Sequence, residues 1–252
     1  MGFRDGLVGY LQQRGAAYVA YTWPERVLAQ LEAASLLAQL SPDEQARYTR
    51  FRFPDDAAVY LVAHALTRRV LARALGCDPR ALSFALREHG RPELAGPAAA
   101  SGLRFNLSHT RGLVACGIAA HDDLGVDVEE LGRRVEIEGL ARRVFSPRER
   151  AGLDALSGEA QRARFFELWT LKEAYVKATG KGLASPLQGI SFLAEQPDPV
   201  PIVFDDPSHD DASRWTFRRH PVDTTHYVSA ALKAGGTAAI SFEALCGEDL
   251  LG

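Results

Sequence analysis

The chain has 252 residues, of which 46% are hydrophobic and 24% charged, and this balance is typical of a soluble globular protein. Its formal net charge of -3 argues against nucleic-acid binding, which usually needs a basic excess. Three cysteines without a CxxC pair argue against a disulfide framework or a zinc site and favour a reducing compartment. The sequence also lacks a long apolar run, so we expect a cytoplasmic protein that enters no membrane.

Helix signals occur twice along the chain, in the same order and at nearly the same spacing. Residues 41–44 and 146–149 each combine an N-cap Ser, a Pro at the first helical position and a Glu two residues later, which forms a capping box. A longer helix is predicted after each box, and each ends at a glycine that suits the residue after a helix. These helices comprise residues 56–75, ending at Gly76, and residues 164–179, ending at Gly180.

Paired strands follow in both parts of the chain. Alternating apolar segments separated by short polar or glycine turns predict two hairpins. The first comprises residues 112–120, a turn at 121–123 and residues 124–129; the second comprises 227–231, a turn at 235–236 and 238–243. The repeated order indicates an internal duplication, and hence an α+β fold of two halves, each an antiparallel sheet packed by a long helix. We divide the chain into residues 1–124 and 125–252, with loops at 92–101 and 195–213.

Two carboxylates share one face of the strand predicted at 124–129. Because side chains alternate along a strand, Asp127 and Glu129 point the same way, and they repel each other unless a cation or water separates them. Taken alone, such a pair is best explained by the exposed face of a hairpin.

The helix predicted at 164–179 changes that interpretation. It is apolar almost all round, yet Glu173 and Lys177 fall in one sector. A solvated i,i+4 pair is the simple alternative, but aromatic neighbours favour a partner or a metal. A third carboxylate beside Asp127 and Glu129 would complete an oxygen site that suits Mg²⁺, with Mn²⁺ also possible.

Four further residues suit an anionic ligand. Ser108 and His109 follow a predicted strand and are expected in a turn, while Arg47 and Arg91 lie near the ends of predicted elements. Alone, a Ser-His pair is more often a turn cap, and single arginines are usually solvated.

Five motifs, in this order along the chain, resemble the phosphopantetheinyl transferases of the surfactin-synthetase-activating type. They are RYTRF at 47–51, GRP at 90–92, FNLSH at 105–109, GVDVE at 125–129 and WTLKEAYVKATGKGL at 169–183. The resemblance implies transfer of phosphopantetheine from coenzyme A to a serine of an apo acyl, polyketide or peptidyl carrier protein, with 3',5'-ADP released. It also implies two halves related by a pseudo-twofold axis, and we expect a monomer.

Residue roles carry over by motif. Asp127, Glu129 and Glu173 would bind Mg²⁺, and Glu173 would be the general base for the serine. Lys177 would stabilise charge on the leaving phosphate. The nucleotide contacts would come from Arg47, Arg91, Ser108, His109 and Lys177. Asp127 also counts among the catalytic residues, whereas Lys172 is expected to pair with a carboxylate or phosphate.

Three observations qualify these roles. Arg91 stands where members of the family often have lysine, so its role is less secure. In the repeat, Arg69 occupies the position that corresponds to Glu173, and Ser241 occupies the position that corresponds to Asp127. Only one half therefore has the full set of carboxylates, which predicts one site instead of two. A metal-dependent nuclease and a non-catalytic module that binds carrier proteins remain alternatives.

Overall fold

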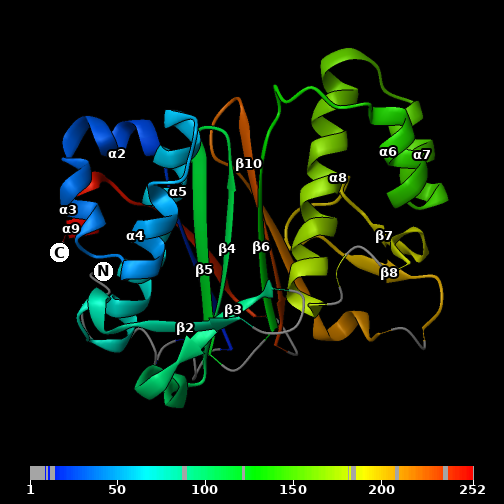
Figure 1. The fold of residues 1–252 in the computed structure, drawn as a ribbon. Helices are drawn as coiled ribbons and strands as arrows, with labels where there is room; N and C mark the ends of the chain where they lie inside the picture. The colour runs from blue at the N-terminus through cyan, green and yellow to red at the C-terminus, as the bar shows by residue number, and fades with distance from the viewer. Residues whose placement is uncertain are drawn as a thin grey trace.

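The computed structural model has four layers in the order helices, sheet, sheet, helices (Figure 1). It describes residues 9, 11, 15–86, 90–120, 123–180, 182, 186–207, 210–234 and 238–251. Residues 121–122 of the turn predicted at 121–123, the turn predicted at 235–236, and Lys181 and Leu183 of the longest motif lie outside the described residues. The third residue of the first turn, Asp123, is described and begins β6 instead.

The first sheet has the strand order β11-β1-β5-β4. Its members are β1 (Ala17–Thr22), β4 (Leu103–Thr110), β5 (Leu113–Ala120) and β11 (Ile240–Ala244). All neighbours are antiparallel except β1 and β11, which run parallel. Its outer face is covered by α5, with the other helices of this layer beside it (Figure 1). These helices are α2 (Pro24–Gln30), α3 (Ala33–Leu37), α4 (Pro42–Tyr48), α5 (Pro54–Leu75) and α9 (Gly247–Leu251).

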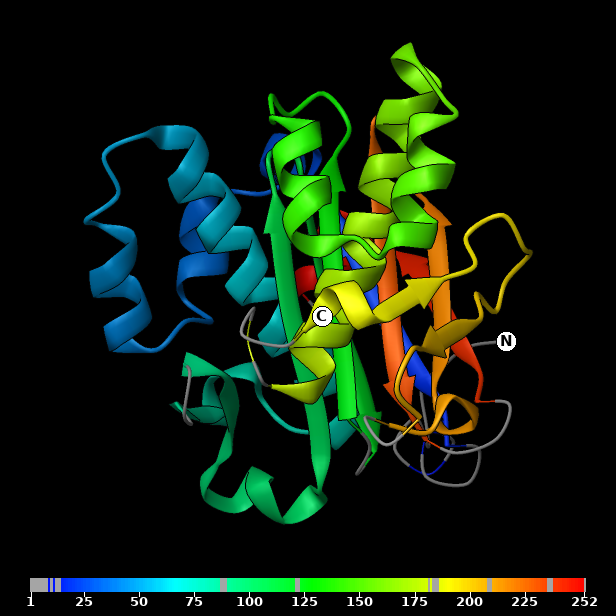
Figure 2. The ribbon, with the colours of Figure 1, turned by 90° about the vertical axis from the view of Figure 1, so that its right-hand side faces the viewer.

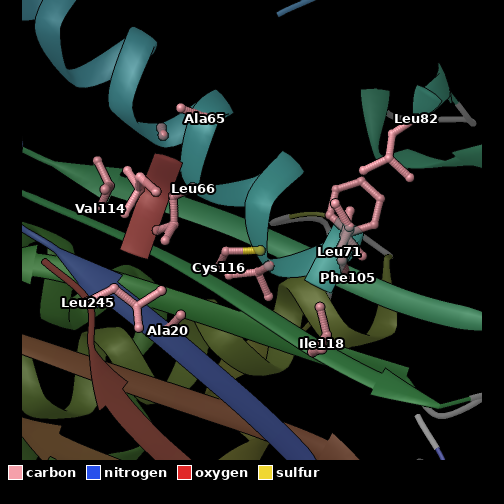
Figure 3. Close-up of a cluster of buried hydrophobic side chains, with 14 of the residues drawn as sticks. Ala20, Ala65, Leu66, Leu71, Leu82, Phe105, Val114, Cys116, Ile118 and Leu245 are labelled. Carbon is pink, nitrogen blue, oxygen red and sulfur yellow. The ribbon is translucent and has the colours of Figure 1, made fainter. Parts of the chain in front are cut away.

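Apolar side chains fill the space between α5 and the first sheet. Leu66 and Leu71 of α5 lie against Cys116 and Ile118 of β5, and all four are fully buried (Figure 3). Each large apolar side chain removed from water in this way contributes about 1.5–3 kcal/mol. This cluster fixes α5 on the sheet and so sets the position of everything that α5 carries.

The second sheet has the order β6-β10-β9, with all neighbours antiparallel. Its outer face is covered by α8, with two short helices and a short hairpin beside it (Figure 2). The strands are β6 (Asp123–Glu130), β9 (Thr216–Pro221) and β10 (His226–Lys233); the helices are α6 (Ile137–Val144), α7 (Pro147–Asp154) and α8 (Gly158–Thr179). The described residues also form two hairpins, β2 (Ser83–Leu86) with β3 (Pro92–Ala95) and β7 (Ile190–Phe192) with β8 (Ile202–Phe204). They include 3₁₀ turns at 79–81, 96–101, 187–189 and 212–214.

The two sheets pack face to face through their inner side chains. Val126 and Val128 of β6 join this apolar layer together with Val19 of β1. A Cβ on Gly117 would lie 2.5 Å from Val126 Cγ2, so the packing of Val126 against β5 requires a residue without a side chain at this position. Since β6 turns its valines inward, alternation turns Asp127 toward α8.

The predicted helix signals are confirmed. Both capping boxes form, at Ser41 with Glu44 and at Ser146 with Glu149. Both long helices end at a left-handed glycine, Gly76 or Gly180. The α+β fold class is confirmed as well, with the parallel pair of β1 and β11 as a departure from purely antiparallel sheets.

The pairing of the predicted hairpins was wrong. β5 pairs with β1 and β4, whereas β6 pairs with β10, so the two strands of the first hairpin lie in different sheets. The second hairpin is divided in the same way, because β10 stays in the second sheet and β11 joins β1. The reason is burial: each of these strands has an apolar face that is covered only when the two sheets stack.

Three local predictions also need correction. Residues 92–101 form β3 and a 3₁₀ turn instead of a loop, with Pro92 as the first residue of its strand. The segment 195–213 contains β8, because Ile202 and Phe204 enter the core. Ser108 and His109 lie within β4 and not in a turn. Within the described ranges, no helix combines the length and apolarity needed to cross a bilayer.

Candidate active site

Close contact between α8 and β6 sets the frame of the candidate site. A Cβ on Gly125 would lie 1.9 Å from the Ala174 carbonyl oxygen and 2.5 Å from the Ala178 nitrogen, so only glycine permits this approach. A hydrogen bond of 2.8 Å between the buried hydroxyls of Thr170 and Ser229 ties the same helix to β10. The helix is therefore held against the strand face that carries the carboxylates.

Asp127 lies at the centre of the site, where residues of both halves meet. Lys177 Nζ is 2.7 Å from Asp127 Oδ1, and it donates to Ser108 Oγ at 2.8 Å. Ser108, from β4 of the first sheet, donates to the same carboxylate oxygen at 3.1 Å. Thus the structure brings together three of the predicted site residues, from β4, β6 and α8.

Glu129 and Glu173 share the electric field of Asp127. Burial, and then the negative charge of Asp127, raise the pKa of Glu129 to about 7 and that of Glu173 to about 6. Arg133 opposes both shifts, and Lys177 opposes the second. Because the negative charge of Asp127 raises the pKa of both Glu129 and Glu173, this group of carboxylates is short of positive charge.

The donor chemistry of this cluster fits a hard divalent ion. Asp127 Oδ2 is buried and accepts no hydrogen bond from the described residues, and carboxylate oxygens are the ligands that Mg²⁺ and Mn²⁺ prefer. In the described part of the chain, however, no three His, Cys, Asp or Glu side chains already converge as a ligand set. Lys177 instead pairs with Asp127, and Arg133 pairs with Glu129.

A pocket of about 690 Å³ opens between the first helical layer and the end of β4. It is lined by Arg47, Phe51, Phe53, Asp55, Asp56, Val59, Tyr60, His109, Thr110 and Arg111. The Tyr60 ring lies 4.1 Å from the His64 ring and 5.6 Å from the Arg47 guanidinium, measured between centroids and to Cζ. Flat aromatic surface beside guanidinium groups suits a phosphorylated nucleoside.

His109 links the pocket to the carboxylates. Its neighbour Ser108 points to Asp127, while His109, on the opposite face of β4, lines the pocket. The ring is exposed at the mouth, yet the surrounding protein displaces enough water to lower the pKa of His109, and Lys177 and His64 add to that effect. The pocket and the carboxylate cluster thus lie on opposite faces of β4.

Comparison with known proteins shows which family the chain belongs to. A sequence profile of the 4'-phosphopantetheinyl transferase superfamily matches residues 123–232, and one of the N-terminal part of 4'-phosphopantetheinyl transferases matches residues 28–122. The chain is 38% identical over 167 residues to the 4'-phosphopantetheinyl transferase HetI of Nostoc sp., a match that covers 66% of this chain and 70% of the relative. It is 31% identical over 182 residues to the 4'-phosphopantetheinyl transferase Sfp of Bacillus subtilis, which covers 72% of this chain and 79% of the relative.

The chain belongs to the 4'-phosphopantetheinyl transferase superfamily. The type and the enzyme class predicted from the motifs are confirmed. The two matched profiles of this superfamily meet at residues 122 and 123, where the chain passes from β5 of the first sheet to β6 of the second.

Two further charged residues of the transferase motifs, Arg91 and Lys172, make contacts within the fold. Arg91 donates to the carbonyl oxygens of Lys177 and Ala178 at 3.4 and 3.3 Å, and so lies at the C-terminal end of α8. Lys172 is 1% exposed and pairs with Glu149 at 2.8 Å, as expected from the sequence. Neither side chain shares the contacts that join Asp127 to Lys177.

Three residues at the candidate site were not singled out from the sequence. Asn106 accepts a hydrogen bond of 2.8 Å from the Val126 amide, and this bond joins β4 to β6. A signal existed, because Asn106 precedes Ser108 by two residues and therefore shares its strand face. The Trp169 side chain donates a hydrogen bond to the Glu129 carboxylate, and Arg133 forms an ion pair with the same carboxylate. No sequence pattern marks Arg133 as the partner of Glu129, because a loop brings it there.

Proposed function

We propose that the chain transfers the 4'-phosphopantetheine group of coenzyme A to a serine of an apo carrier protein and releases 3',5'-ADP, in a reaction that depends on Mg²⁺. The observation that supports this most is the meeting of Ser108, Asp127 and Lys177 from both halves, with a nucleotide-sized pocket across β4. The relatives named as phosphopantetheinyl transferases support the same group transfer.

Nucleotide binding is assigned to the pocket and its rim. Arg47 and His109 line it, so we propose that they contact the phosphates of the nucleotide, with Arg111 as a third cation. Ser108 lies between this pocket and the carboxylates and would orient the pyrophosphate. Arg91 contributes by holding the end of α8, and with it Lys177, toward the same group.

The chemistry follows from the carboxylate cluster. Glu173 would take the proton of the carrier serine while its oxygen forms a bond to the phosphorus that carries pantetheine. The bond from that phosphorus to the ADP oxygen breaks, and Lys177 stabilises the charge on the departing phosphate. A divalent ion held by Asp127, Glu129 and Glu173 would supply Lewis acidity and neutralise the pyrophosphate.

A transfer assay tests the proposal directly. The purified protein is incubated with Mg²⁺, coenzyme A and a panel of apo carrier proteins from fatty-acid, polyketide and peptide synthesis. We expect a carrier mass gain of one phosphopantetheine, which is lost on omission of Mg²⁺ and in Asp127→Asn. Asp123→Asn is a matched control, because Asp123 is an exposed carboxylate on the same strand. Cleavage of DNA without any carrier mass gain would favour the nuclease alternative instead.

A further inference from the structure

The loop after β6 is fixed at three points. The Leu131 amide donates to the Thr225 carbonyl at 2.8 Å, and the Arg133 amide donates to the Glu130 carbonyl at 3.1 Å. Arg162 of α8 donates to the carbonyl oxygens of Leu131 and Arg133. Because these bonds come from the turn before β10, from β6 and from α8, the path of the loop is set by the elements around it, and it directs Arg133 back toward the strand.

Arg133 meets Glu129 at the end of this path. Its Nη2 lies 3.0 Å from Glu129 Oε1. The Glu129 side chain is 9% exposed, whereas that of Arg133 is 42% exposed. A guanidinium that is already half in water loses little when it moves away, but a buried carboxylate that loses its cation needs another. The pair is therefore asymmetric, and Arg133 is the partner that can be exchanged.

Lys177 is bound differently at the neighbouring carboxylate. Besides Asp127, it donates to Ser108 Oγ and to the Val126 carbonyl oxygen at 3.1 Å. It therefore keeps partners if Asp127 turns to another cation. Glu129, in contrast, offers an incoming ion the oxygen that Arg133 now occupies.

We propose that Arg133 is a positioning residue that holds Glu129 as an internal counter-ion in the ion-free enzyme and is displaced when the divalent ion binds. This inference rests on the proposed function, because it takes Glu129 as one of the metal ligands. Arg133 then keeps the buried carboxylate aimed at the site, and it lowers the affinity for the ion because the ion and the guanidinium compete for the same carboxylate oxygen.

Direct measurement of ion binding tests this without reference to turnover. Mn²⁺ is titrated calorimetrically into the full chain, in mildly alkaline buffer and without coenzyme A. Removing one positive charge from beside a divalent ion should tighten binding about tenfold in Arg133→Ala. Arg133→Lys, which retains the charge, should stay close to wild type. Arg134→Ala is the matched control, since Arg134 is the exposed neighbour and should leave the affinity unchanged.

The same substitution made in a Glu129→Gln variant distinguishes competition for the Glu129 carboxylate from a general effect of the lost charge. In Glu129→Gln, the further change Arg133→Ala should alter Mn²⁺ affinity by less than about twofold. Unchanged or weaker Mn²⁺ binding in Arg133→Ala would overturn the inference, as would equal tightening in Arg134→Ala. If neither wild type nor variant binds Mn²⁺, the metal assignment and this inference fail together. Transfer activity, measured on the same preparation, reports separately on the proposed function.

Discussion

The two halves of the molecule repeat one structural device. In the first half, Glu44 closes its capping box and pairs with Arg68 of the long helix at 2.7 Å. In the second half, Glu149 does the same with Lys172 at 2.8 Å. Each cation also donates to two backbone carbonyls that follow its helix in the chain. Arg68 donates to those of Pro79 and Leu82, and Lys172 donates to those of Leu187 and Ile190. Both halves thus contain a buried ion pair that joins the short helix to the long one.

The neighbouring positions differ between the halves. Where the second half has Glu173, the first has Arg69, whose Nε donates to the Asp249 carbonyl of α9 at 3.0 Å. On β11, Glu243 accepts a hydrogen bond of 2.7 Å from the buried Tyr18 hydroxyl, and Ser241 donates to the Ala17 carbonyl. The side chains of Arg69, Glu243 and Ser241 thus form hydrogen bonds that join elements of the fold. The same arrangement of helices and strands thus carries stabilising contacts in the first half and a cluster of carboxylates in the second.

The largest expected effect is on activity, and it should differ between matching substitutions in the two long helices. Glu173→Gln should lower the transfer rate by about 10³–10⁴-fold, because it removes the proposed base and a proposed metal ligand. Arg69→Gln, at the matching position of α5, should stay within about twofold of wild type. Carrier mass gain over time measures both. Equal loss in the two variants would mean that the halves do not differ in function as we propose.

The buried ion pairs give the next largest effect, on stability. Lys172→Met leaves Glu149 without its cation in a site that is 1% exposed, and should lower the free energy of unfolding by about 3–5 kcal/mol. Arg68→Met should cost less, because Glu44 is 13% exposed and keeps His64 as a partner at 2.8 Å. Urea denaturation of both variants checks the order. A smaller loss in Lys172→Met than in Arg68→Met would contradict it.

Acid stability tests the first half alone. Burial by itself raises the pKa of Glu44, but hydrogen bonds from His64, the Ser41 amide and Arg68 outweigh it and hold the pKa at about 2, below the ordinary 4.5. A lowered pKa stabilises the folded state fully above about 4.5, and this stabilisation is lost as the pH falls toward about 2.

Glu44→Gln should therefore be less stable than wild type at neutral pH by about 2–3 kcal/mol. The difference in unfolding free energy should shrink as the pH falls from about 4.5 to about 2. Urea denaturation across this range measures it, with the exposed Glu25→Gln as control. A difference that stays constant with pH would show that the carboxylate charge of Glu44 does not carry the effect.

The capping serines give the smallest difference. Ser146 is 1% exposed and is hydrogen-bonded to the Ser191 hydroxyl at 2.8 Å, whereas Ser41 is partly exposed. Ser146→Ala should cost about 1–2 kcal/mol and Ser41→Ala about 0.5–1 kcal/mol. Thermal unfolding followed by circular dichroism measures the two losses. Equal losses would mean that burial of the cap adds nothing to the capping bond.

The sequence by itself determined the features that depend on residues close together in the chain. A Ser, a Pro and a Glu within four positions are enough to start a helix, and both predicted boxes form because their bonds span three residues. Strand alternation turned Asp127 away from the valine layer, as predicted. Lys172 was expected to pair with a charged group, because a cation within an apolar helix is not stable alone, and it pairs with Glu149.

Only the tertiary structure decided which distant segments meet. β5 and β6 are adjacent in sequence, yet they lie in different sheets, because stacking the sheets buries apolar faces that a hairpin would leave open. Arg91 meets the carbonyl oxygen of Lys177 at the end of α8 across 86 residues of chain. Arg133 is only four residues from Glu129, but their contact depends on a loop that Thr225 and Arg162 hold in place. Local patterns carry no information on such contacts, since their free energy comes from burial and charge pairing between elements far apart in the chain.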